Sequence, residues 1–108
     1  MTEVPLWSAH VTALDGHRTV RLAGELDMAA ADELIELLLA ELGTPGAAAV
    51  EADLGAVTFF DSAALGALIV AYQRAEETDR QFSVTNPTRT VRRVLEITGV
   101  YDFLVRPA

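Results

Sequence analysis

The spacing of apolar side chains divides the chain into strands and helices. Alternating apolar and polar residues predict strands over 6–14 and 18–24, and the Asp15-Gly16 pair between them is a hairpin turn signal. Residues 24–43 change to a helical period. The apolar side chains of that segment share one helix face: Leu34, Ile35, Leu38, Leu39 and Leu42. We therefore expect an antiparallel hairpin followed by a helix.

The second half of the chain repeats the alternation of strands and helices. A largely buried strand is predicted over 47–54, and a fourth strand over 80–85. Between them a second helix is predicted to begin at Asp61 or Ser62, either of which can cap it, and to run to about Glu77.

End signals mark the other predicted helices. Asp27 is a plausible N-cap of the first helix, and Gly43 stops it. A third helix is predicted within 86–99, capped by Thr88 and stopped by Gly99. Its expected inner face consists of Val91, Val94, Leu95 and Thr98. The last segment, 100–107, is predicted as a short closing strand or an extended tail.

This order of elements predicts one α/β domain over residues 1–108. Strands that alternate with helices form a mainly parallel sheet, and the first hairpin adds an antiparallel edge. We expect a mixed sheet of four to five strands with about three packed helices. Functional groups in such sheets lie at the carboxyl ends of the strands, which selects the loops "GELD" (24–27) and "FFDS" (59–62). We expect these loops to be neighbours.

The amino-acid composition limits the kinds of partner and the cellular location that we expect. The net charge is −8, from sixteen acids against eight bases, which argues against nucleic acid and anionic membranes as partners. There is no cysteine, and no segment reaches the ~20 apolar residues of a membrane span. The first ten residues lack the basic start of a secretory signal. We expect a cytoplasmic protein, as a monomer or weak dimer.

Residues for catalysis are sparse. His10 and His17 fit no metal-binding spacing, and Ser62 lies in no nucleophile motif. Asp27 and Asp61 have two interpretations. They can form a carboxylate pair for acid–base work or a divalent ion, or they can be two helix caps. We expect no cofactor, no metal and no enzymatic activity.

The second predicted helix has an unusual outer face. No charge occurs between Ser62 and Gln73. Larger apolar side chains form the stripe expected to pack on the sheet: Leu65, Leu68, Ile69 and Tyr72. The other side is small and apolar up to a single base: Ala63, Gly66, Ala67, Val70, Ala71 and Arg74. Either both faces are buried, or the small face is a docking patch. We expect the patch, with Ala67 and Val70 facing outward and Ser62 at its rim.

Three blocks of the sequence resemble one protein family. "RLAGELDMAAADEL", "DLGAVTFFDSAALGALIVAY" and "NPTRTVRRVLEITGVYDFL" are similar to the STAS domain of bacterial anti-sigma factor antagonists, in the family's order and spacing. The resemblance covers nearly the whole chain. It implies a mixed sheet with helices packed on it, and a regulatory protein that is not an enzyme.

The resemblance also implies a partner and a switch. The unphosphorylated antagonist binds an anti-sigma factor, itself a serine kinase, and thereby frees a sigma factor. The kinase phosphorylates a serine of the antagonist and ends the association, and a phosphatase restores it. The family's serine corresponds to Ser62, beside Asp61, and its Gly-Glu-Leu-Asp loop ends here at Asp27. The expected partner-binding residues are Glu25, Ala63, Gly66, Ala67, Val70 and Arg74.

The sequence departs from the family motif at two positions, and other functions remain open beside the switched antagonist. Ala63 replaces a second hydroxyl and Ala64 replaces a glycine, whereas Leu65 and Gly66 are kept. One alternative is a STAS interaction module without serine switching, such as a small subunit of a lipid transporter or a scaffold component. A weaker one is a small hydrolase or nucleotide-binding enzyme that uses Asp27, Asp61 and Ser62.

Overall fold

The computed structural model describes residues 6–106, which form four strands and four helices. In chain order these are β1 (Trp7–Leu14), β2 (His17–Leu26), α1 (Met28–Leu42), β3 (Ala49–Phe60), α2 (Ser62–Glu77), β4 (Gln81–Thr85), α3 (Arg89–Ile97) and α4 (Tyr101–Leu104). The strands make one sheet in the order β1-β2-β3-β4. β1 is antiparallel to β2, and the other pairs are parallel. The predicted mixed sheet with an N-terminal antiparallel hairpin is confirmed.

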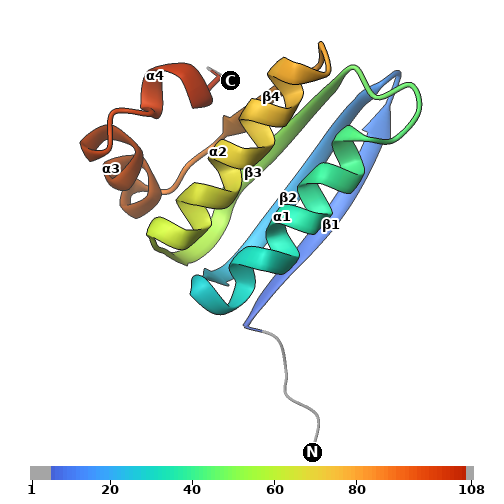
Figure 1. Ribbon diagram of the computed structural model, residues 1–108. Coiled ribbons are helices and arrows are strands. Elements are labelled where there is room, and N and C mark those ends of the chain that lie inside the picture. Colours follow the sequence, from blue (N-terminus) through green and yellow to red (C-terminus); the bar gives the residue numbers. More distant parts are fainter. Residues whose placement is uncertain (1–5, 107–108) are drawn as a thin grey trace, which may run out of the picture.

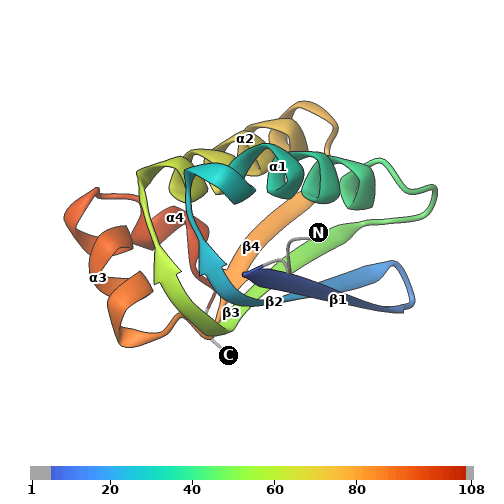
Figure 2. The same ribbon diagram turned by 90° about the horizontal axis from the view of Figure 1, so that it is seen from below.

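The helices cover the sheet unevenly. α1 and α2 lie side by side on one face (Figure 1), and Figure 2 shows α3 and α4 beyond the β3–β4 side. Apolar side chains between these layers form the core, in which the largest fully buried ones include Leu22, Leu26, Leu34, Leu38, Leu54, Leu68, Leu95 and Leu104. Within 6–106, no helix is both long and apolar enough to cross a membrane.

The sheet face opposite α1 and α2 is polar. The Nε2 atom of His17 lies 3.4 Å from Oε1 of Glu51, and Nε of Arg21 lies 3.6 Å from Oδ2 of Asp53. The hydroxyl of Thr85 donates a hydrogen bond to Oε2 of Glu51 at 3.1 Å. These cross-strand contacts satisfy the polar groups and leave only one face of the sheet for the core.

The predicted conformation of the C-terminal segment is wrong. Residues 101–104 form the short helix α4, where we expected a strand or extended tail, and residue 107 lies outside the described part. Of residues 100–106, only Val105 pairs with β4, through a single bridge to Val84. The reason lies in the spacing of the buried residues Val100 and Leu104, which are four residues apart and share one helix face.

The remaining differences concern element ends. β2 continues to Leu26 and β3 to Phe60, so most of the two predicted loops belongs to strands. Thr98 is exposed and its hydroxyl donates back to the Val94 carbonyl at 2.7 Å, so it is not part of the inner face of α3. The predicted cap of α3 is confirmed, because Thr88 accepts the amide of Val91.

Candidate functional site

The parallel strands β2 and β3 end side by side, which brings the two predicted segments together. Leu26 pairs with Phe60, and the amide of Asp61 donates to the Leu26 carbonyl at 3.3 Å. α1 and α2 therefore begin next to each other, at the carboxyl edge of the sheet (Figure 1). The prediction that "GELD" and "FFDS" are neighbours is confirmed.

Asp61 connects the beginnings of both helices. Its Oδ1 accepts the amides of Ala63 at 3.0 Å and Ala64 at 3.1 Å, as an N-cap of α2. Its Oδ2 accepts the amide of Met28, the first residue of α1, at 3.1 Å. One carboxylate thus stabilises two helix N-termini, whose dipoles both favour negative charge there.

Asp27 acts on α1 alone. Its Oδ1 accepts the amides of Ala29 at 3.0 Å and Ala30 at 3.2 Å. Across 6–106, no group of three or more histidine, aspartate or glutamate side chains has an arrangement suited to a metal ion. Of the two interpretations of Asp27 and Asp61, the helix caps are the one that the geometry supports.

Ser62 is the first residue of α2, and its side chain is exposed. Asp61 is the N-cap, so the alternative that Ser62 caps the helix is wrong. None of the hydrogen bonds found between residues 6 and 106 uses the Ser62 hydroxyl. The amides of the next three residues are all bonded to Asp61. A phosphate on Ser62 would therefore meet a carboxylate rather than a row of free amides.

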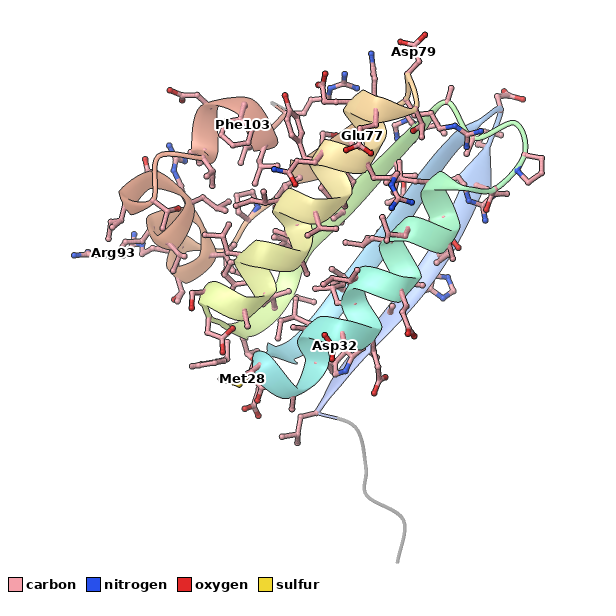
Figure 3. The ribbon with its side chains drawn as sticks, viewed as in Figure 1. Met28, Asp32, Glu77, Asp79, Arg93 and Phe103 are labelled. Carbon is pink, nitrogen blue, oxygen red and sulfur yellow. The ribbon has the colours of Figure 1, made fainter. Side chains whose placement is uncertain are left out.

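Two exposed apolar side chains near Ser62 were not among the residues predicted from the sequence. Met28 is 77% exposed and Phe59 is 47% exposed. Figure 3 shows Met28 at the end of the molecule where α1 begins. Phe59 pairs in register with Glu25, which is also exposed. These exposed residues lie where β2 and β3 end and the helices begin, and we call Glu25, Met28, Phe59 and Ser62 together the Ser62 edge. Two consecutive phenylalanines at a strand end were the available signal, because only one of them can face the core.

The small face of α2 is only partly exposed. Val70 is 36% exposed as expected, but Ala67 is 1% exposed, so the prediction that it faces outward is wrong. Arg74 lines a hollow with Leu39 of α1 and with Gly43, the C-cap of α1, so its side of α2 faces that helix. Ala67 lies two turns before Arg74 on the same side. Its small side chain allows α1 and α2 to pack closely.

Other predicted contact residues on α2 keep some exposure. Ala63 and Gly66 are half-buried, and Arg74 is exposed with its Nε 3.8 Å from Oε2 of Glu77. Ala64 is fully buried, so its methyl group belongs to the core and does not project toward a partner. The exposed apolar surface of α2 beside Ser62 is therefore smaller than the sequence predicted.

The open space around Gly66 leads to a prediction about stability. A Cβ atom added at Gly66 would have no neighbouring atom within 4 Å, so the fold does not require glycine there. Gly66→Ala should raise the free energy of unfolding by roughly 0.5–1 kcal/mol, because alanine loses less backbone entropy in a helix. Chemical denaturation measures the change. A lower free energy of unfolding would show that neighbouring atoms crowd a side chain at position 66.

Comparison with known proteins identifies the family. A family model described as "Mlab, STAS domain" matches residues 9–106. The chain belongs to the STAS domain family. The STAS domain is 27% identical over 90 residues to an anti-sigma-B factor antagonist of Staphylococcus epidermidis, covering 83% of this chain and 82% of the relative.

Solved structures have the same fold. The crystal structure of an anti-sigma factor antagonist from Mycobacterium paratuberculosis is 27% identical, with a TM-score of 0.83, covering 94% of this chain and 86% of that one. The unphosphorylated form of the anti-sigma factor antagonist SpoIIAA has a TM-score of 0.79 at 19% identity, covering 94% of this chain and 89% of that one. Because the identity to SpoIIAA is low, that similarity shows the STAS fold alone.

Proposed function

We propose that this STAS domain is a cytoplasmic anti-sigma factor antagonist. Its unphosphorylated form binds an anti-sigma factor that is a serine kinase and thereby releases a sigma factor. Phosphorylation of Ser62 ends the association, and a phosphatase acting on phosphoserine restores it. The observation that carries the proposal is the Ser62 hydroxyl, which is exposed, engaged in no hydrogen bond of the described structure, and adjacent to Asp61. The 27% identical antagonists support it.

The proposed docking surface consists of the Ser62 edge and the exposed part of α2. Met28, Phe59 and Val70 supply apolar area for desolvated contacts. Ser62 lies where α1 and α2 begin, so a phosphate there places charge at the margin of these contacts. Asp61 beside it already carries negative charge, which makes a further dianion costly to desolvate against a partner.

Capture of the partner tests the proposal. Immobilised wild-type protein, Ser62→Ala and Ser62→Asp are each exposed to the native cytoplasm, and bound proteins are identified by mass spectrometry. We expect wild type and Ser62→Ala to retain an anti-sigma factor with a kinase domain, and Ser62→Asp to lose it. Retention of the same protein by all three would favour a STAS module without serine switching. Retention of no anti-sigma factor would contradict the proposal.

Val70 tests the α2 part of the docking surface. Val70→Glu should weaken binding of the captured partner at least tenfold, because it inserts a charge into an apolar contact. The free energy of unfolding should change by less than ~0.5 kcal/mol, since the side chain is partly exposed. Ile97→Glu on α3, where the side chain is 74% exposed, is the control and should bind like wild type. If Val70→Glu unfolds the domain, residue 70 belongs to the core and the α2 contact is excluded.

A further inference from the structure

β1 is the outer strand of the sheet, and one of its edges is unpaired in the part of the chain that the structure describes. Among residues 6–106 it pairs only with β2, through an antiparallel ladder in which Leu14 lies opposite His17 across the two-residue turn. Pairs that flank such a turn exchange hydrogen bonds, and bonded pairs then alternate along the strand. The amide of Glu25 donates to the Leu6 carbonyl, in agreement with this alternation. Even-numbered residues of β1 therefore bond to β2, and the backbone groups of odd-numbered residues point outward.

This edge lacks the usual protection against pairing with another strand. Exposed edges are normally blocked by charged side chains, proline or a bulge. Residues 6–14 contain no aspartate, glutamate, arginine, lysine or proline, although the chain as a whole carries 24 such charges, 16 acids and 8 arginines. The register between β1 and β2 runs without a bulge over all eight residues of β1. The strand is thus a regular, uncharged template for a further strand.

Both ends of the edge carry exposed leucines. Leu6 is 64% exposed and Leu14 is 75% exposed. Val11 lies opposite the buried Val20, so odd-numbered side chains face the helices and even-numbered ones face the open side of the sheet. Leu6 directly precedes β1, and its carbonyl continues the ladder by accepting the Glu25 amide, so the two leucines lie on the same side of the sheet, eight residues apart.

Pairing with a second copy of the chain accounts for both the uncharged strand edge and the two exposed leucines. If two β1 strands pair antiparallel about a two-fold axis at His10, Leu6 of each copy lies opposite Leu14 of the other. Ala9 then faces Val11 of the second copy, and the outward backbone groups of these odd residues exchange hydrogen bonds. The even residues become the pairs without hydrogen bonds, in which side chains approach most closely. The surface is self-complementary, as a two-fold interface requires.

We propose that β1 pairs with β1 of a second copy to form a weak symmetric dimer with one continuous sheet. One strand edge buries much less than the ~800 Å² per partner of a standard stable interface, so the association is reversible. Each copy also carries a net charge of −8, and the uncharged segment 6–14 lets the two approach despite that repulsion.

Sedimentation equilibrium from micromolar to millimolar protein tests the dimer. We expect the average mass to rise toward twice the monomer value with concentration, and association to strengthen with salt, because salt screens the repulsion. Leu14→Glu should weaken it at least tenfold. Ile97→Glu, matched in exposure at 74% against 75%, should not. A monomer at every concentration and salt level would overturn the proposal, as would equal effects of the two variants.

Cysteine cross-linking tests the register, since the chain has no cysteine of its own. His10 and Thr12 are both exposed, so H10C and T12C should melt like wild type. The H10C positions face each other with Cα atoms about 4.5 Å apart, within disulfide range. The T12C positions are four residues out of register, about 14 Å apart. Mild oxidation should cross-link H10C and leave T12C monomeric. Any other outcome overturns the two-fold pairing at His10.

Discussion

Asp61→Ala should lower the free energy of unfolding by about 2–3 kcal/mol, which sums a lost helix cap and a lost charged hydrogen bond to a second helix. The carboxylate accepts two amides of α2 and the amide of Met28 in α1. Its removal therefore leaves donors at both helix beginnings without a partner. Urea denaturation of wild type and variant measures the difference.

Two further variants separate these contributions. Asp27→Ala removes a cap that serves α1 alone, so it should cost only about 1 kcal/mol. Asp61→Asn should lie between wild type and Asp61→Ala, because an asparagine oxygen still caps α2 whereas its NH₂ group cannot accept the Met28 amide. If Asp61→Ala costs no more than Asp27→Ala, the bond between Asp61 and Met28 adds nothing and the connection of the two helices is wrong.

Ser62→Asp should weaken binding of the anti-sigma factor at least 100-fold, whereas Ser62→Ala should bind like wild type. A desolvated like-charge contact costs several kcal/mol, and about 2.7 kcal/mol corresponds to 100-fold. Both variants should unfold within ~0.5 kcal/mol of wild type, because the helix is capped by Asp61 and the Ser62 side chain is exposed. Titration calorimetry and thermal melting together measure the two effects.

Thr90→Asp is the matched control for the added charge. Thr90 is an exposed hydroxyl residue in the first turn of α3, so the substitution makes the same chemical change near another helix N-terminus. It should leave the affinity within a factor of two. If Ser62→Asp and Thr90→Asp weaken binding equally, net charge explains the loss and Ser62 has no special position.

Most of the architecture could be predicted because local signals and tertiary packing agree. Asp27 and Thr88 mark helix beginnings through side-chain oxygens that accept nearby backbone amides, and Gly43 marks a helix end through its own backbone amide. The adjacency of Asp27 and Asp61 followed from the order of strands, since parallel strands end at a common edge. These features require no knowledge of side-chain contacts between distant elements.

The errors concern features that only tertiary contacts decide. A helical period shows that Ala67 lies opposite the sheet-facing stripe, but it does not distinguish a side covered by α1 from one in water. The segment of α4 is too short for periodicity to separate helix from strand. Contacts with distant residues accompany its helical form: the rings of Phe103 and Tyr72 lie 5.0 Å apart, and Arg92 lies 5.0 Å from the Tyr101 ring.

We propose above all that one phosphate on Ser62 controls binding of the anti-sigma factor. The most direct measurement is a calorimetric titration of that partner with the wild-type protein, fully phosphorylated by the kinase, and with the same sample after phosphatase treatment. We expect mass spectrometry to place the phosphate on Ser62, the affinity to fall at least 100-fold, and dephosphorylation to restore it. Equal affinities before and after phosphatase treatment, or a phosphate on another residue, would contradict the account.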